Sequence, residues 1–195
     1  MPDSSLSSRA PARRVFHPIT RPMALTAKQV QRTRREVPDP GQDPGITPLS
    51  DAECAEMTAR LMRDHDGPLW IFAYGSLIWN PGFPVGRIRR AVAHGWHRSF
   101  CLKLTSWRDS PEFPGLMMAL ERGGSTTGLL TEVPPGQEAQ GLEALLRREM
   151  PGREHAGMAR WIKTRSDGQV IRALTFWAGP TGPIVVSGLP PETVA

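Results

Sequence analysis

The sequence predicts an α+β fold, with a small mixed, barrel-like sheet and flanking helices. Between residues 69 and 178 apolar and polar residues mostly alternate, as they do in strands, and one helical pattern interrupts this region. Repeated strand-and-helix units, which would indicate a parallel sheet, do not occur in the sequence. A chain of 195 residues is long enough to bury a core of this kind in one domain.

Residues 1–47 are expected to be a basic, largely disordered tail and linker. They carry eight Lys and Arg against four Asp and Glu, and few large apolar side chains occur before residue 23. A short basic helix is predicted over 24–35. The domain itself, residues 48–195, carries sixteen Lys and Arg against fifteen Asp and Glu. Because the basic excess lies in the tail, we expect no nucleic-acid-binding surface on the domain.

The domain is expected to begin with a helix over 51–64. Ser50 can cap the first turn and Glu53 follows three residues later, which is the spacing of a capping box. A bulge is predicted at Gly95. Strands are predicted over 69–73, 87–104, 116–120, 127–133, 159–164 and 170–178, and further helices over 137–150 and from residue 191.

The composition excludes several classes of protein. No run of eighteen apolar residues predicts a membrane span, and no apolar segment after the first arginines predicts a secretory signal. Two cysteines, Cys54 and Cys101, do not make a disulfide framework, so we expect a cytoplasmic protein. His94 and His97 are expected on opposite faces of one strand, which does not favour a metal site.

The most distinctive stretch is residues 70–82, where an apolar strand stops at Tyr74-Gly75-Ser76. Gly75 lets the backbone turn without a Cβ, and successive N–H groups in such a turn can bind an anion. Tyr74 is the only tyrosine in the chain, and Ser76 adds a hydroxyl donor. The hypothesis is that this turn holds the carboxylate end of a small substrate. The alternative is an ordinary turn between a strand and a loop.

Glu149 is the candidate catalytic residue. It lies on the same predicted helix face as Leu142, Leu145 and Leu146, so its carboxylate is expected to face inward. Burial would raise the pKa of this carboxylate, which suits a general acid or base near neutral pH. A buried ion pair, or a glutamate at the edge of the apolar stripe, would explain the same pattern.

Several spaced motifs resemble those of the ChaC-like gamma-glutamylcyclotransferases, which act on glutathione, from about Met23 to the last residue. The matching stretches are Tyr74-Gly75-Ser76-Leu77 with Ile78-Trp79 and Pro81, Arg108-Asp109-Ser110-Pro111-Glu112 with Pro114-Gly115-Leu116, Arg148-Glu149-Met150, Arg160-Trp161, and Ala173-Leu174-Thr175-Phe176.

The resemblance implies a lyase that cleaves glutathione to 5-oxoproline and cysteinylglycine. It implies that Glu149 is the catalytic acid/base and that no metal or organic cofactor takes part. The fold it implies is a small mixed barrel with flanking helices. The gamma-glutamyl group would be held by Ala73, Tyr74, Gly75, Ser76 and Leu77.

Two departures from the family pattern bear on function. Residues 151–159 lack a tyrosine that the family usually has there, and the family's helices after the equivalent of Pro191 are absent, which is expected to leave the site open. Three alternatives therefore stay open: a cyclotransferase for another gamma-glutamyl amide, a non-catalytic protein that binds a gamma-glutamyl ligand or a partner, and an RNA-associated protein acting through the basic tail.

Overall fold

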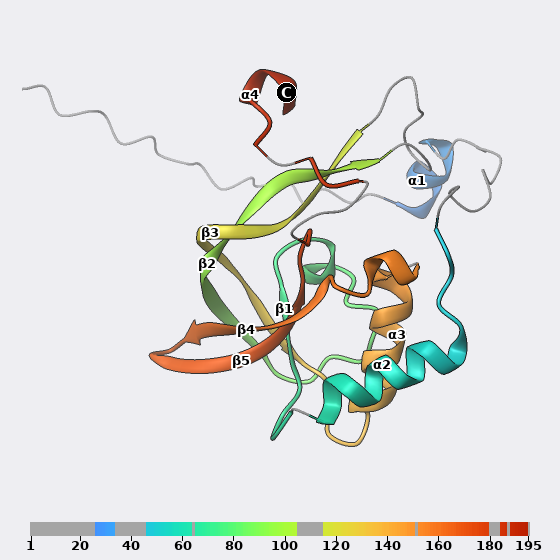
Figure 1. Ribbon diagram of the computed structural model, residues 1–195, viewed down its shortest axis with the longest axis vertical. Coiled ribbons are helices and arrows are strands. Elements are labelled where there is room, and N and C mark those ends of the chain that lie inside the picture. The colour runs from blue at the N-terminus through green and yellow to red at the C-terminus, as the bar shows by residue number, and fades with distance from the viewer. Residues whose placement is uncertain are drawn as a thin grey trace, which may run out of the picture. The chain divides into compact units, whose positions relative to one another are not determined.

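The computed structural model of the protein describes residues 26–33, 46–63, 65–104, 115–150, 152–179, 184–186 and 188–194 (Figure 1). The chain divides into two compact units, Met1–Pro38 and Asp39–Ala195. The predicted disordered segment 1–22 and the motif at 108–112 lie outside the described residues. The domain boundary at residue 48 stays a prediction.

The first unit contributes one described helix, α1 (Ala27–Thr33), inside the helix predicted over 24–35. Its start is capped in both directions. The Gln29 N–H donates to the Thr26 hydroxyl at 3.3 Å, and the Thr26 N–H donates to the Gln29 side-chain oxygen at 2.8 Å. These bonds satisfy N–H groups that the first turn of a helix leaves without partners.

Five strands of the second unit form a closed barrel in the order β1-β3-β2-β4-β5. β1 runs antiparallel to β3 and parallel to β5, and the other neighbours are antiparallel. This confirms the predicted small mixed barrel. The strands are β1 (Trp70–Ala73), β2 (Ile88–Leu104), β3 (Gly115–Glu132), β4 (Ala159–Ser166) and β5 (Gln169–Phe176).

Two helices, α2 (Asp51–Arg63) and α3 (Glu138–Glu149), lie beside the barrel (Figure 1). Alternate side chains of β1 pack in two different hydrophobic clusters. Ile71 packs with the buried faces of both helices, whereas Phe72 packs in a second cluster formed by strand residues. Burying a leucine or phenylalanine contributes roughly 1.5–3 kcal/mol, so β1 holds helices and barrel together.

The predicted capping box at the start of α2 is confirmed. The Glu53 N–H donates to the Ser50 hydroxyl at 3.3 Å, and the Ser50 N–H donates to the Glu53 carboxylate at 2.9 Å. Three short helices complete the description: η1 (Ser76–Ile78), η2 (Arg153–His155) and α4 (Pro191–Val194). None of the described helices is long and apolar enough to cross a membrane.

The structure corrects one prediction, because β3 is a single long strand where the sequence predicted two. The glycines read as a loop, Gly123 and Gly124, have φ of 108° and 62° and lie opposite the predicted bulge at Gly95, whose φ is 79°. β2 and β3 therefore bend together, and pairing continues beyond the bulge from Trp96 with Arg122. Glycine accommodates this bend because it adopts positive φ without a steric penalty.

Candidate active site

β1 carries the candidate binding residues to the C-terminal end of α3. Ala73 ends the strand in the core, and Leu77 is only 6% exposed and packs in the same cluster as Leu145 and Leu146 of α3. The segment between them, with Ala73 and Leu77 included, is called here the 73–77 turn. It is anchored at both ends by buried side chains, so its backbone is held against the helix that carries Glu149.

Several backbone donors of the 73–77 turn have no acceptor among the described residues. Two of its carbonyls are occupied, since the Ile78 N–H donates to the Gly75 carbonyl at 3.0 Å and the Trp79 N–H to the Ser76 carbonyl at 3.1 Å. The N–H groups of Gly75, Ser76 and Leu77, by contrast, donate to no acceptor among the described residues. Consecutive free N–H groups of this kind can bind an oxyanion.

Gly75 leaves open space beside those donors. Its φ is −137°, so the turn does not use the left-handed region that favours glycine. A Cβ placed on Gly75 would meet only the Met118 methyl, at 3.9 Å, among the described residues. The missing side chain therefore opens the backbone to a ligand, and the surrounding side chains do not require a glycine.

Tyr74 is partly buried and packs against the second core cluster. Burial raises the pKa of its phenol well above the ordinary value, and the negative charge of Glu149 raises it further. The phenol therefore stays protonated at physiological pH and can donate a hydrogen bond. Two of the predicted site residues, Tyr74 and Glu149, are therefore near enough for the charge of one to affect the other.

Glu149 is the last residue of α3, and its side chain is 23% exposed. It lies at the edge of the apolar stripe, and the leucines of that stripe are fully buried, as predicted. Burial raises the pKa of the carboxylate, and the positive charge of Arg148 opposes this rise. The Arg148 Nε lies 3.1 Å from Glu149 Oε1. The Glu149 carboxylate is therefore partly buried and forms a partly exposed ion pair with the neighbouring Arg148.

Sequence reasoning assigned no role to Arg148, which lies off the buried stripe. In the structure its Nη1 donates to the carbonyl of Asn80, and its Nη2 lies 3.5 Å from the hydroxyl oxygen of Ser76. One guanidinium therefore contacts both Glu149 and the 73–77 turn. The signals in the sequence were the position of Arg148 immediately before the candidate acid and its place in Arg148-Glu149-Met150, one of the stretches that resemble the family.

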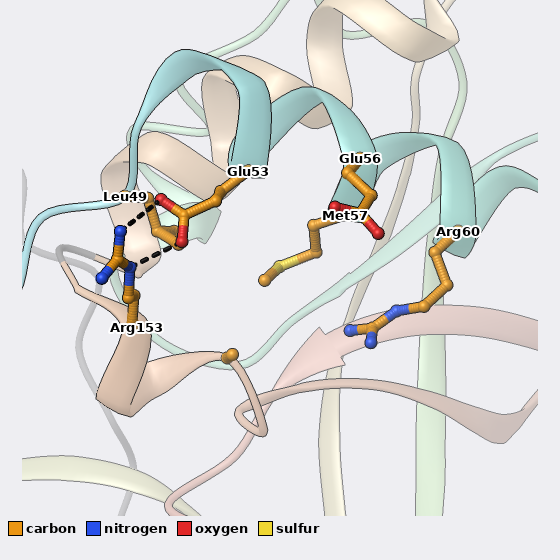
Figure 2. A pocket seen from close by; sticks show the side chains of 7 residues that line it. Leu49, Glu53, Glu56, Met57, Arg60 and Arg153 are labelled. Atoms are coloured by element: carbon orange, nitrogen blue, oxygen red, sulfur yellow. Dashed lines mark hydrogen bonds and ion pairs between the residues drawn. The ribbon is translucent and has the colours of Figure 1, made fainter.

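A separate pocket of about 320 Å³ lies between α2 and η2 (Figure 2). None of the predicted site residues lines it. Two charged groups of the pocket already form a pair, since Arg153 Nε lies 2.5 Å from the Glu53 carboxylate that caps α2. The residues that line the pocket are Leu49, Glu53, Glu56, Met57, Arg60, Arg153 and Ala156.

Within the described residues, no group of three or more His, Cys, Asp or Glu side chains is placed to hold a metal.

The candidate site lies within a region that matches a known sequence family. Residues 69–194, which include the 73–77 turn and Glu149, match the family described as ChaC-like protein. The chain belongs to the ChaC-like family.

Two relatives of this ChaC-like chain carry the same functional name. The glutathione-specific gamma-glutamylcyclotransferase of Escherichia coli (strain K12) is 35% identical over 148 residues, which cover 75% of this chain and 63% of that protein. The glutathione-specific gamma-glutamylcyclotransferase 1 of Homo sapiens is 31% identical over 144 residues, covering 71% and 64%. The chain thus spans slightly less than two thirds of the length of each relative.

A solved structure shares the fold of the ChaC-like chain. It is the crystal structure of a yeast gamma-glutamyl cyclotransferase specific to glutathione, with a TM-score of 0.58 and 17% sequence identity. The match covers 66% of this chain and 76% of the yeast chain. At this identity the likeness concerns the fold, and it supports the predicted α+β barrel.

Proposed function

We propose that this ChaC-like chain is a glutathione-specific gamma-glutamylcyclotransferase, a lyase that converts glutathione to 5-oxoproline and cysteinylglycine. One observation carries the proposal: a turn with three backbone donors that have no acceptor among the described residues meets a partly buried carboxylate at the end of α3, and both contact Arg148. The functional names of the E. coli and human relatives support the same substrate.

The 73–77 turn would hold the gamma-glutamyl group. The N–H groups of Gly75, Ser76 and Leu77 would bind its alpha-carboxylate or oppose the charge that develops on the carbonyl oxygen. The Ser76 hydroxyl and the protonated Tyr74 phenol add polar groups to the same turn. Holding the substrate folded brings the alpha-amine to its own gamma-carbonyl, and orientation of this kind can supply up to about 7–11 kcal/mol of the barrier.

Glu149 would carry the protons. Its carboxylate accepts one proton from the alpha-ammonium, and the freed amine attacks the gamma-carbonyl carbon to close a five-membered ring. Glu149 then delivers this proton to the amide nitrogen of the leaving cysteinylglycine, and the carbon–nitrogen bond to that nitrogen breaks. A second proton, lost from the ring nitrogen, follows the same route, so the products are a neutral lactam and an ammonium group.

Glu149→Gln tests the catalytic role. The amide keeps the shape of the side chain and cannot accept a proton, so we expect 5-oxoproline production to fall by about 10²–10⁴-fold, with little change in KM. The measurement is chromatographic detection of 5-oxoproline after incubation with glutathione.

The matched control for that experiment is Glu143→Gln. Glu143 lies on the same helix and pairs with Arg147, away from the turn. It should retain wild-type turnover. Near-wild-type 5-oxoproline production by Glu149→Gln would refute the proposed role.

The substrate is tested separately with a panel of gamma-glutamyl compounds. We expect turnover of glutathione and much less of gamma-glutamyl-alanine and gamma-glutamyl-lysine. A preference for either of these would indicate a cyclotransferase of another specificity. Thermal stabilisation by 5-oxoproline without turnover of any compound would indicate a non-catalytic binding protein.

We also propose that the reaction takes place in the cytoplasm. Both cysteines, Cys54 and Cys101, are buried free thiols, as expected in a reducing compartment. Fractionation of cells that express the full chain tests this location, and recovery of the protein outside the cytoplasmic fraction would contradict it.

A further inference from the structure

The Arg148 side chain contacts residues outside its own helix as well as Glu149. Each of its three side-chain nitrogens has a different partner: Nε lies 3.1 Å from Glu149 Oε1, Nη1 donates to the Asn80 carbonyl, and Nη2 lies 3.5 Å from Ser76 Oγ. A guanidinium is planar and presents its donors in a fixed fork. The position of one partner is therefore coupled to the positions of the other two.

Gly82 provides an independent sign that the chain accommodates this side chain. A Cβ placed on Gly82 would lie 3.1 Å from Arg148 Nη1 and 3.4 Å from Arg148 Cδ. Gly82 also has a φ of 76°, a conformation that residues with side chains seldom adopt. The backbone after η1 thus lies close to the Arg148 side chain, and a side chain at residue 82 would crowd it.

We propose that Arg148 is a positioning residue, whose guanidinium fixes the Glu149 carboxylate to the segment Ser76–Asn80 and so holds the base and the substrate-binding turn in one geometry. The inference rests on the proposed function and deepens it, since it names the group that orients the acid/base. Arg148 touches neither the reacting atoms nor the bound substrate in this role.

The neighbouring Arg147 has different partners among the described residues and stabilises the helices without contacting the candidate site. Arg147 lies 2.7 Å from both the Asp51 and the Glu143 carboxylates, which joins α3 to α2 and supports the helix itself. It contacts no residue of the 73–77 turn among its described partners. Arg147 and Arg148 therefore make a matched pair, with the same side chain, one residue apart, and different partners.

The positive charge of Arg148 also has a consequence for proton transfer. In the described part of the chain, the charged and titratable groups that interact with Glu149 are Arg148 and the Tyr74 phenol. The phenol is neutral at physiological pH, so Arg148 is the group that opposes the rise in the Glu149 pKa caused by burial. Removing the charge leaves the effect of burial unopposed, and the Glu149 pKa rises further.

Three variants separate positioning from charge and from helix stability. For Arg148→Met we expect kcat to fall at least about tenfold with a smaller change in KM, and the acid limb of the pH profile to move to higher pH, because the positive charge beside the Glu149 carboxylate is lost. For Arg148→Lys we expect the acid limb to stay near the wild-type position while kcat remains low. A single ammonium keeps the charge, yet it cannot reach three separated partners in a fixed plane.

Arg147→Met is the control, and it should keep wild-type kcat and the wild-type acid limb. The inference is overturned if Arg148→Lys turns over like wild type, because charge alone would then suffice. It is also overturned if Arg147→Met and Arg148→Met lose the same activity, because the loss would then come from the end of the helix.

A titration independent of turnover completes the test. Carbon NMR of the Glu149 carboxyl, assigned with Glu149→Gln, should report a higher pKa in Arg148→Met than in wild type and no change in Arg147→Met. Absence of 5-oxoproline from the wild-type reaction would refute the proposed function, and the titration would then still test the contact between Arg148 and the Glu149 carboxylate that the inference requires. An unchanged Glu149 pKa in Arg148→Met overturns it.

Discussion

At the residue scale, Gly75 of the 73–77 turn leaves open space that the proposed substrate could occupy. A methyl group at this position would meet only the Met118 side chain, 3.9 Å away, among the described residues. The same methyl would occupy the space beside the free N–H groups of the turn. For Gly75→Ala we therefore expect a KM for glutathione at least about tenfold higher, the effect of losing about 1.4 kcal/mol of binding.

Thermal unfolding of Gly75→Ala provides the control for folding. Its midpoint should remain near that of wild type and well above that of the strand variant Gly128→Ala described below. An unchanged KM would show that the space beside Gly75 is not used by the substrate.

The residues of the site differ in how far their roles follow from sequence. Glu149 could be predicted as a candidate because its spacing from Leu142, Leu145 and Leu146 places it on one helix face, and helical periodicity is a strong local signal. Arg148 was missed because its partners, Ser76 and Asn80, are about seventy positions away in the chain. No pattern within α3 reports such contacts, which exist only after the barrel has brought β1 to the end of the helix.

At the scale of elements, Gly128 of β3 lies so close to β1 that there is no room for a side chain. A Cβ on Gly128 would lie 2.4 Å from the Ala73 carbonyl oxygen and 2.7 Å from the Phe72 ring. Backbone atoms in a sheet cannot move aside as a flexible side chain can. We therefore expect Gly128→Ala to lower the free energy of unfolding by about 1–3 kcal/mol, as overpacking of a core typically does.

Chemical denaturation measures that loss, and Gly157→Ala is its control. Among the residues that the structure describes, no atom lies within 4 Å of the Gly157 Cβ position, and its φ is not left-handed, so this variant should be close to wild type in stability. Equal stability of the two variants would mean that the β1–β3 contact relaxes without cost.

Element predictions succeeded where the signal is local and failed where it depends on the partner strand. The capping box of Ser50 and Glu53 fixed the start of α2. The strands predicted over 159–164 and 170–178 occur as β4 and β5, joined by a turn at Asp167 and Gly168. The interruption predicted near Gly123 did not occur, because β2 bends at the same level and keeps its pairing with β3. A glycine pair in one sequence does not distinguish a loop from a shared bend.

At the scale of the domain, three carboxylates join segments that are distant in sequence. Glu53 pairs with Arg153, Glu132 pairs with Arg87, and Glu154 accepts the Thr47 N–H. The Arg153 partner lowers the Glu53 pKa to about 2, and hydrogen bonding to partners lowers the pKa of Glu132 and Glu154. The native state therefore binds fewer protons at these groups than the unfolded chain, which makes stability depend on pH.

The sign of that dependence gives a prediction for acid unfolding. The stabilisation from a carboxylate with a lowered pKa is complete above its unfolded value, near 4.5, and is lost as pH falls toward 2. We expect the thermal midpoint to drop steeply between pH 5 and about pH 2.5, and Glu53→Gln to flatten part of this drop. Glu56→Gln removes a carboxylate of the same helix that has no ion pair within the described residues, so it should keep the wild-type slope. Parallel curves for wild type and Glu53→Gln in calorimetry would show that the pair with Arg153 is not responsible.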